Sequence, residues 1–145
     1  MTRLDPDASV ERALAMLSDP SPAVSTTARN ALRRQPLALT RSELLAILRN
    51  APAFHVARNI VLLLPELPRW QSLLALLDVV VEADDDAIVA LARDRVTWWD
   101  AKAVRRQSTP TRSEVEAVLL ALTRAEHVLD PHLIANLRFT LTPFR

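Results

Sequence analysis

The chain repeats itself along its length, and this repetition limits the folds open to it more than any other feature. The tripeptide Ala-Arg-Asn at residues 28–30 returns at residues 57–59, an offset of 29 residues. Residues 44–48, Leu-Leu-Ala-Ile-Leu, match residues 73–77, Leu-Leu-Ala-Leu-Leu, at the same offset. Two different segments therefore share one spacing, which indicates a repeating unit of about 30 residues.

Apolar spacing and helix start signals predict two helices in each unit. Val10, Leu14 and Leu17 follow the i, i+4, i+7 pattern of one helical face. In the next segment we expect the apolar face to consist of Val24, Ala28, Ala31 and Leu32. Capping residues are expected at the helix starts, namely Asp5, Ser21, Asn50, Asp84 and Asp130. The predicted helices span approximately residues 6–18, 22–34, 41–50, 52–64, 69–82, 85–103, 111–126 and 131–141.

The composition excludes several classes of active site. The sequence has no glycine, so it has no Walker loop, no dinucleotide-binding Gly-rich turn and no lipase-type nucleophile elbow. It also has no cysteine, which excludes disulfides, thiol nucleophiles and thiolate zinc sites. No serine or histidine lies in a recognisable catalytic motif. We therefore expect a protein that is not an enzyme and that has no cofactor and no metal site.

The second helix of the first pair carries residues in the order that HEAT-type repeats use. These residues are Asp19, Pro22, Val24, Ala28, Ala31 and Leu32. The chain resembles the HEAT-repeat family at these places, although Ser25 stands where that family usually has arginine. The resemblance implies an all-α fold, a right-handed α-solenoid of about four antiparallel helix pairs. It implies one domain over residues 1–145, with regular repeats at about 6–103 and a divergent capping pair at about 111–141.

A solenoid of this kind binds its partners along a concave face that the second helices line. Arg29 and Arg58 occupy equivalent positions in two repeats, as do Asn30 and Asn59. In the related armadillo arrays such asparagines hold the main chain of an extended peptide, because an amide both donates and accepts. The alternative is that these asparagines bond to inter-repeat loops, while the arginines are solvated or pair with nearby acids.

The sixth predicted helix combines charged and aromatic residues. Three aspartates at its start and basic residues at its end suit the helix macrodipole better than a metal cluster. We expect Trp99 to lie on the buried face with Val96, and Trp98 to be the more exposed tryptophan. Beside Arg95, an exposed Trp98 is a candidate anchor for a partner, since Trp and Arg are enriched at binding hot spots.

Three weaker interpretations remain. The same aromatic and basic groups could stack on nucleic-acid bases, as in HEAT-like DNA glycosylases, although a net charge of +1 does not favour nucleic acid as the partner. His127 and His132 lack the spacing of a zinc site. The polar stretch from Arg105 to Thr111 is expected to be a connector, with a regulatory phosphosite as the alternative.

The sequence thus predicts a noncatalytic protein-protein interaction or scaffold module in the cytoplasm, with another protein as its partner. Its expected binding residues are Arg29, Asn30, Arg58, Asn59, Arg95 and Trp98. A nucleic-acid-binding or DNA-repair protein is the first alternative, and an immunity or antitoxin-like binding protein is the second. No apolar run approaches the ~18 residues that a membrane span needs, so no membrane association is expected.

Overall fold

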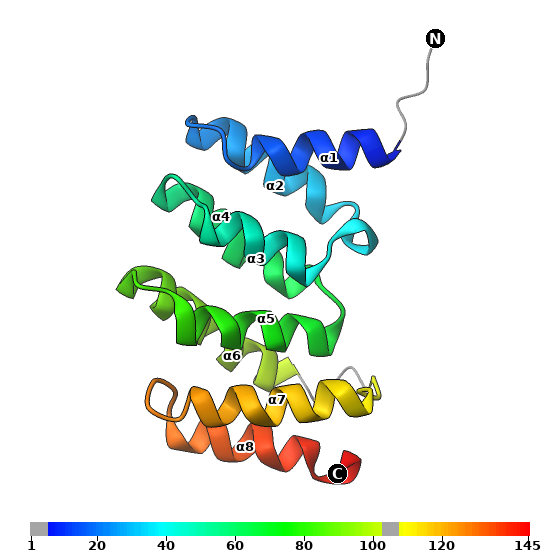
Figure 1. Ribbon diagram of the computed structural model, residues 1–145, viewed down its shortest axis with the longest axis vertical. Coiled ribbons are helices and arrows are strands. Elements are labelled where there is room, and N and C mark those ends of the chain that lie inside the picture. The colour runs from blue at the N-terminus through cyan, green and yellow to red at the C-terminus, as the bar shows by residue number, and fades with distance from the viewer. Residues whose placement is uncertain (1–5, 103–107) are drawn as a thin grey trace. The chain divides into compact units, whose positions relative to one another are not determined.

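The computed structural model describes residues 6–102 and 108–145, and this part of the chain contains eight α-helices and no β-strand (Figure 1). The α-helices are α1 (Pro6–Met16), α2 (Pro22–Arg33), α3 (Arg41–Arg49), α4 (Phe54–Leu63), α5 (Arg69–Glu82), α6 (Asp86–Lys102), α7 (Arg112–Arg124) and α8 (Pro131–Leu141). Short 3-10 helices include η1 (Pro36–Ala38), η2 (Leu64–Glu66) and η4 (Thr142–Phe144). The all-α prediction is confirmed, and each predicted helix is present.

Two of the predicted helix starts have the expected cap, and two do not. Ser21 accepts a hydrogen bond from the backbone N–H of Val24, and Asp130 accepts one from the N–H of His132. The prediction for Asn50 is wrong, because Asn50 ends α3 and α4 begins after Ala53, which offers no side-chain cap.

At α6 the capping oxygen belongs to Asp85 rather than to the expected Asp84. Asp85 Oδ1 accepts from the backbone N–H groups of Ala87 and Ile88, at 2.8 and 3.3 Å. The prediction of Asp84 as the cap is therefore wrong by one residue. The predicted cap Asp5 lies outside the described residues, as do Arg105 and Arg106 of the expected connector.

No helix end within the described residues uses a left-handed residue. Within residues 6–102 and 108–145 the backbone has no positive φ angle and no cis peptide bond. Helices commonly end with glycine in the left-handed region, but this chain has no glycine. Instead the C-cap of α2 is Arg34, with φ −78° and ψ −10°, and the C-cap of α5 is Ala83, in an extended conformation. These angles are open to any L-residue.

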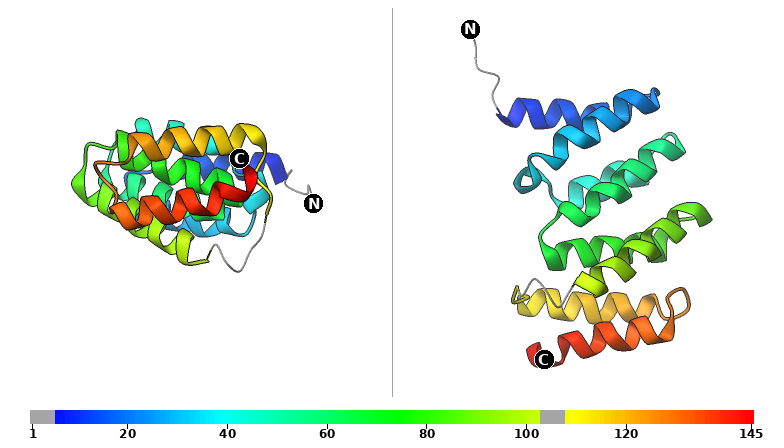
Figure 2. Two further views of the ribbon diagram at one scale, coloured as in Figure 1. Left: turned by 90° about the horizontal axis from the view of Figure 1, so that it is seen from below. Right: turned by 180° about the vertical axis from the view of Figure 1, so that it is seen from behind.

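The chain divides into two compact units, Met1–Leu67 (unit 1) and Pro68–Arg145 (unit 2). In unit 1, α1 packs against α2, α3 packs against α4, and the two pairs meet where α2 contacts α4 (Figure 1). In unit 2, α5 packs against α6 and α7, and α8 contacts both α6 and α7. Figure 2 shows α7 and α8 running side by side in opposite directions. The expectation of a single domain stays a prediction.

The core of unit 1 includes a polar residue that the apolar pattern missed. On α2 the buried residues are Ser25, Ala28 and Leu32, whereas Ala31 is exposed. The predicted stripe was therefore wrong at Ala31. A serine can occupy the interior here because its hydroxyl donates to the backbone oxygen of Leu17 over 2.6 Å, which satisfies both polar groups.

The core of unit 2 follows the expected pattern more closely. Ala92, Val96 and Trp99 on α6 are buried, whereas Trp98 is 46% exposed. The predictions of a buried Trp99 and a more exposed Trp98 are therefore confirmed. Nine of the 14 residues of α5 are buried, because this helix packs between α6 and α7. Each fully buried Leu contributes about 1.5–3 kcal/mol by leaving water.

Candidate functional site

Helices α2 and α4 of unit 1 carry basic side chains and no acidic ones. Their sequences contain Arg29, Arg33 and Arg58 but neither Asp nor Glu. The whole chain has a net charge of only +1. These two packed helices are therefore more positive than the rest of the chain. We call Arg29, Arg33 and Arg58 the arginine cluster.

A chain of hydrogen bonds positions Arg29. Its Nη1 donates to Oδ1 of Asn59 at 2.8 Å, and Nδ2 of Asn59 donates to Oγ of Ser25 at 2.7 Å. The Ser25 hydroxyl in turn donates to the Leu17 carbonyl. This sequence of donors fixes the orientation of the Asn59 amide, because a flipped amide would turn its NH₂ group toward the guanidinium.

Arg29 is partly buried and lies close to two other positive charges. Burial lowers its pKa, and the nearby positive charges of Arg33 and Arg58 lower that pKa further. The Nε atom of Arg29 is buried and has no hydrogen-bond partner among the described residues. Its Nη2 has a long contact of 3.4 Å with Oδ1 of the exposed Asn30. A charge-assisted hydrogen bond usually has a donor-acceptor distance of about 2.7–2.9 Å, so one edge of this guanidinium retains binding capacity.

The other two arginines of the cluster are Arg33 on α2 and Arg58 on α4. Arg33 donates from Nη2 to the backbone oxygen of Leu62 at 3.3 Å, and its Nε lies 3.8 Å from Glu66 Oε1. Arg58 is exposed and has no hydrogen bond or ion pair within the described part of the chain. One turn before it, Phe54 exposes 50% of its surface. The three guanidinium groups of the arginine cluster thus have one carboxylate at their periphery and one exposed aromatic ring beside them.

The two asparagines of the predicted site have different environments. Asn30 is exposed, as expected of a surface contact. Asn59 is only 1% exposed, and both ends of its amide are engaged inside unit 1. Asn59 is therefore a positioning residue for Arg29, and it offers no free group for direct contact with a ligand. The partners of Asn59 are side chains of α2, so it bonds within the protein but not to an inter-repeat loop as the alternative interpretation expected.

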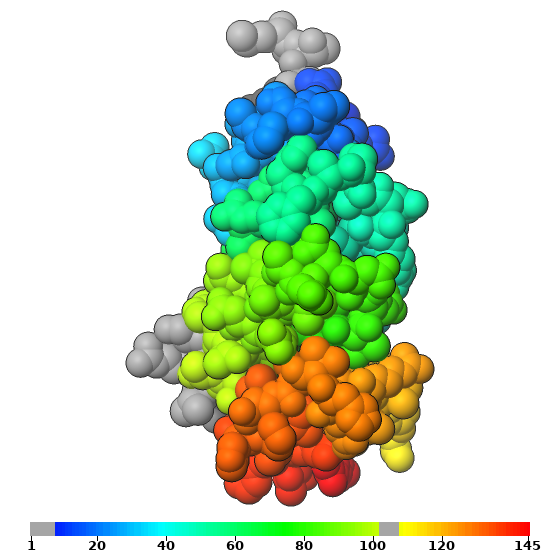
Figure 3. Space-filling model, turned by 90° about the vertical axis from the view of Figure 1, so that its left-hand side faces the viewer, coloured from blue at the N-terminus to red at the C-terminus, as the bar shows by residue number. Residues whose placement is uncertain are grey.

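A polar contact also joins the α1–α2 turn of unit 1 to the start of α4. His55 Nε2 lies 2.8 Å from the backbone oxygen of Asp19, so the ring nitrogen donates to that oxygen. In Figure 3 the side chains around the α1–α2 and α3–α4 turns contact each other without an intervening hollow. His55 therefore faces the α1–α2 loop.

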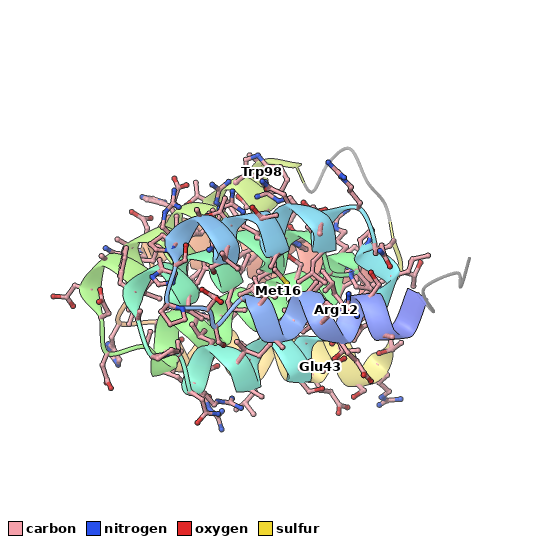
Figure 4. All side chains as sticks on the ribbon, turned by 90° about the horizontal axis from the view of Figure 1, so that it is seen from above. Arg12, Met16, Glu43 and Trp98 are labelled. Atoms are coloured by element: carbon pink, nitrogen blue, oxygen red, sulfur yellow. The ribbon has the colours of Figure 1, made fainter. Side chains whose placement is uncertain are left out.

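In unit 2 the predicted contact residues lie on α6. Trp98 projects from the outer side of this helix (Figure 4). Arg95 is half-buried, and its Nε is buried without a partner among the described residues. Asp100 is half-buried as well, and burial raises the pKa of its carboxyl group. The side chain of Lys102, at the end of α6, lies outside the described part of the chain.

A cluster around Trp70 in unit 2 was not found from the sequence. Trp70 and Trp99 pack edge to face with ring centres 5.2 Å apart, and the Arg69 guanidinium lies 4.8 Å from the Trp99 ring centre. Trp99 Nε1 donates to the backbone oxygen of Arg69, and Trp70 Nε1 donates to that of Ser108. Because both indoles are buried with satisfied N–H groups, this cluster stabilises unit 2.

The α7–α8 region offers little for metal binding. Glu126 forms an ion pair with Arg138, and Asp130 caps α8, so both carboxylates near His127 and His132 have other partners. The described residues contain no group of three or more potential metal ligands. A shallow hollow of about 260 Å³ is lined by Glu126, Pro131, Ile134, Ala135 and Arg138. The ion pair between Glu126 and Arg138 forms part of the lining of this hollow.

No protein-family model matches the chain, and the searches of curated proteins and of solved structures found no match either. Among the described helices none is long and apolar enough to cross a membrane. The cytoplasmic location stays a prediction.

Proposed function

We propose that the chain is a noncatalytic interaction module that binds another protein through the α2–α4 face of unit 1. Its helix pairs are proposed to be HEAT-like repeats stacked as a right-handed α-solenoid. The contact residues are Arg29 and Arg58, with Asn59 holding Arg29 in place and Asn30 occupying the free edge of Arg29 until the partner binds. Arg95 and Trp98 on α6 are proposed as a second contact region.

One observation carries this proposal above the others. Three arginines gather on two packed helices that have no acidic residue of their own, and burial and mutual repulsion lower the pKa of one of them. Keeping like charges together costs stability. A partner that neutralises them would offset that cost, and arginine is the charged residue most enriched at interaction hot spots.

Affinity capture with a charge-reversed surface tests the proposal. The variant Arg29→Glu/Arg58→Glu is compared with Arg12→Glu/Arg124→Glu, which makes the same charge change at exposed arginines of α1 and α7. We expect the first variant to lose a partner that the wild-type chain captures from its native host, and the second to retain it. Equal capture by both variants would remove the α2–α4 face from the interaction.

A salt titration distinguishes the nucleic-acid alternative. Contacts with several phosphates make affinity fall steeply with ionic strength, because each contact releases counterions. A protein partner held by a few arginines and an aromatic ring is expected to show a shallower dependence. Saturable binding of an oligonucleotide with a steep salt dependence would favour the nucleic-acid alternative instead.

A further inference from the structure

We infer that the arginine cluster is a carboxylate site and that the partner presents an acidic segment, whose Asp or Glu side chains bind Arg29, Arg33 and Arg58. This inference rests on the proposed function, since it names the chemistry of the partner at the same face. It also assigns Arg29 as the central ligand-binding residue and Asn30 as the group that the carboxylate displaces.

The charge distribution determines the sign of the ligand. Arg29, Arg33 and Arg58 are close enough for the charges of the latter two to lower the pKa of the first. The carboxylate that the structure pairs with this cluster is Glu66, which lies 3.8 Å from Arg33 at the periphery. Arg29 and Arg58 have no acidic residue on α2 or α4 to balance their charge. An anion is therefore the complementary ligand.

The geometry of Arg29 favours a planar, bidentate anion. Its Nη1 is committed to Asn59, which leaves the opposite edge of the guanidinium, formed by Nε and Nη2. Nε has no partner, and Nη2 has only the 3.4 Å contact with Asn30. A carboxylate that displaces the exposed Asn30 amide would accept from Nη2 first, and the buried Nε would become its second donor once that displacement uncovers this edge. Such a pair of hydrogen bonds is the geometry in which arginine binds carboxylates most strongly.

The surroundings favour a peptide over a nucleic acid. The cluster is short and bordered by Glu66, whereas a phosphate backbone requires a continuous basic track. The half-exposed Phe54 lies one turn from Arg58 on α4, so an acidic residue followed by an apolar one would fit this face. The net charge of +1 argues in the same direction.

Fluorescence anisotropy with a labelled hexaglutamate peptide tests the inference in the full-length chain. We expect saturable binding at 50 mM NaCl, no binding of hexaglutamine, and weaker binding of a hexathymidylate than of hexaglutamate. Arg58→Gln is expected to weaken hexaglutamate binding about 10-fold or more, whereas the exposed control Arg124→Gln leaves it unchanged. Circular dichroism confirms that each variant is folded.

Two further variants separate binding by the guanidinium fork from general charge attraction. Arg29→Lys keeps the charge but loses the planar fork, so we expect an affinity loss of about 3- to 10-fold. Asn30→Ala removes the group that competes for Nη2, so we expect equal or tighter binding. A site that is only a diffuse positive patch would tolerate Arg29→Lys and show no such loss, which would overturn the inference.

Failure of the inference and failure of the proposed function give different results. If Arg29→Glu/Arg58→Glu abolishes capture of the partner but hexaglutamate does not bind, the proposed function stands and the carboxylate site is overturned. If hexathymidylate binds more tightly than hexaglutamate and depends on the same arginines, the carboxylate site is also overturned. If hexaglutamate binds as expected but capture is unaffected by the double variant, the proposed function is the claim that falls.

Discussion

Arg29 on α2 donates a hydrogen bond to Asn59 on α4 over 2.8 Å, and this bond joins the buried interior of unit 1 to its basic surface. Asn59 is buried, while Arg29 reaches the face that carries Arg58. The position of the proposed ligand-binding group therefore depends on an interior amide. Stability and binding are coupled at this pair of residues.

Replacing the interior amide tests that coupling. Asn59→Leu keeps the branching of the side chain but leaves Nη1 of a partly buried guanidinium without its acceptor, and we expect unfolding to require about 2–3 kcal/mol less. Urea unfolding followed by circular dichroism measures the change. The control Asn30→Leu alters an exposed asparagine one position from Arg29, and it should stay within about 0.5 kcal/mol of wild type. Equal effects would show that the network does not stabilise unit 1.

The two neighbouring tryptophans of α6 are expected to respond differently to the same substitution. Trp99→Phe removes the indole N–H that donates to Arg69 and weakens the packing on Trp70, which should cost about 1–3 kcal/mol. Trp98→Phe changes an exposed ring and should cost less than about 0.5 kcal/mol. Thermal unfolding of both variants measures the difference. A larger loss for Trp98→Phe would contradict the buried and exposed assignments.

The burial of Asp100 predicts a pH-dependent stability. Because burial raises its pKa in the folded state above the ordinary value of 3.8, the folded chain holds this proton more tightly than the unfolded chain does. The free energy of unfolding contributed by Asp100 therefore decreases as pH rises from below 3.8 through the raised value. Asp100→Asn should have a higher urea midpoint than wild type at pH 7 and the same midpoint near pH 3.

A matched variant on the same helix controls for the lost charge. Asp94 is exposed on α6, so Asp94→Asn removes one negative charge without relieving burial. If Asp94→Asn raises the urea midpoint at pH 7 as much as Asp100→Asn does, net charge explains the effect and the burial of Asp100 does not.

Repulsion within the arginine cluster predicts that losing one exposed charge stabilises the unliganded chain. Arg58→Gln should raise the free energy of unfolding by about 0.2–0.5 kcal/mol at low salt, the usual scale for a like-charge pair. The gain should vanish at 1 M NaCl, where charges are screened within about 3 Å. The control Arg12→Gln removes an exposed arginine from α1 (Figure 4). A stabilisation that persists in high salt would have a different origin.

The start of α6 gives a direct comparison of two adjacent aspartates. Asp85→Ala removes the oxygen that accepts from Ala87 and Ile88, and loss of such a cap costs about 0.5–2 kcal/mol. Asp84→Ala removes an exposed carboxylate that does not cap the helix, so its effect should be much smaller. Chemical denaturation of the two variants distinguishes them, and a larger cost at Asp84 would restore the cap that the sequence predicted.

The sequence was sufficient for the order and approximate bounds of the helices because the signals for these are local. Proline and a capping side chain start α2 and α8, and the predicted range 131–141 coincides with α8. At α6 three consecutive aspartates offered equal signals, and only the backbone geometry selects Asp85. At α4 the expected start was too early, because Asn50 bonds backward to Ala46 instead.

The candidate site could be predicted only in part because its key contacts join distant residues. Repeat matching selected Arg29 and Arg58 but not Arg33, whose partners Leu62 and Glu66 lie about 30 residues away. Likewise, Ser25 first appeared only as a departure from the family pattern. Its role depends on Asn59, and no local signal links two residues 34 positions apart.

The backbone of the described residues never enters the left-handed region, and this has a consequence for how the chain can be altered. No turn in that part of the molecule depends on one particular amino acid for its torsion angles. Apart from the side chains that cap helices, surface connections are therefore free to diverge in sequence while the helices they join keep their places. Epitopes or reporter peptides could be grafted there without preserving any special backbone residue.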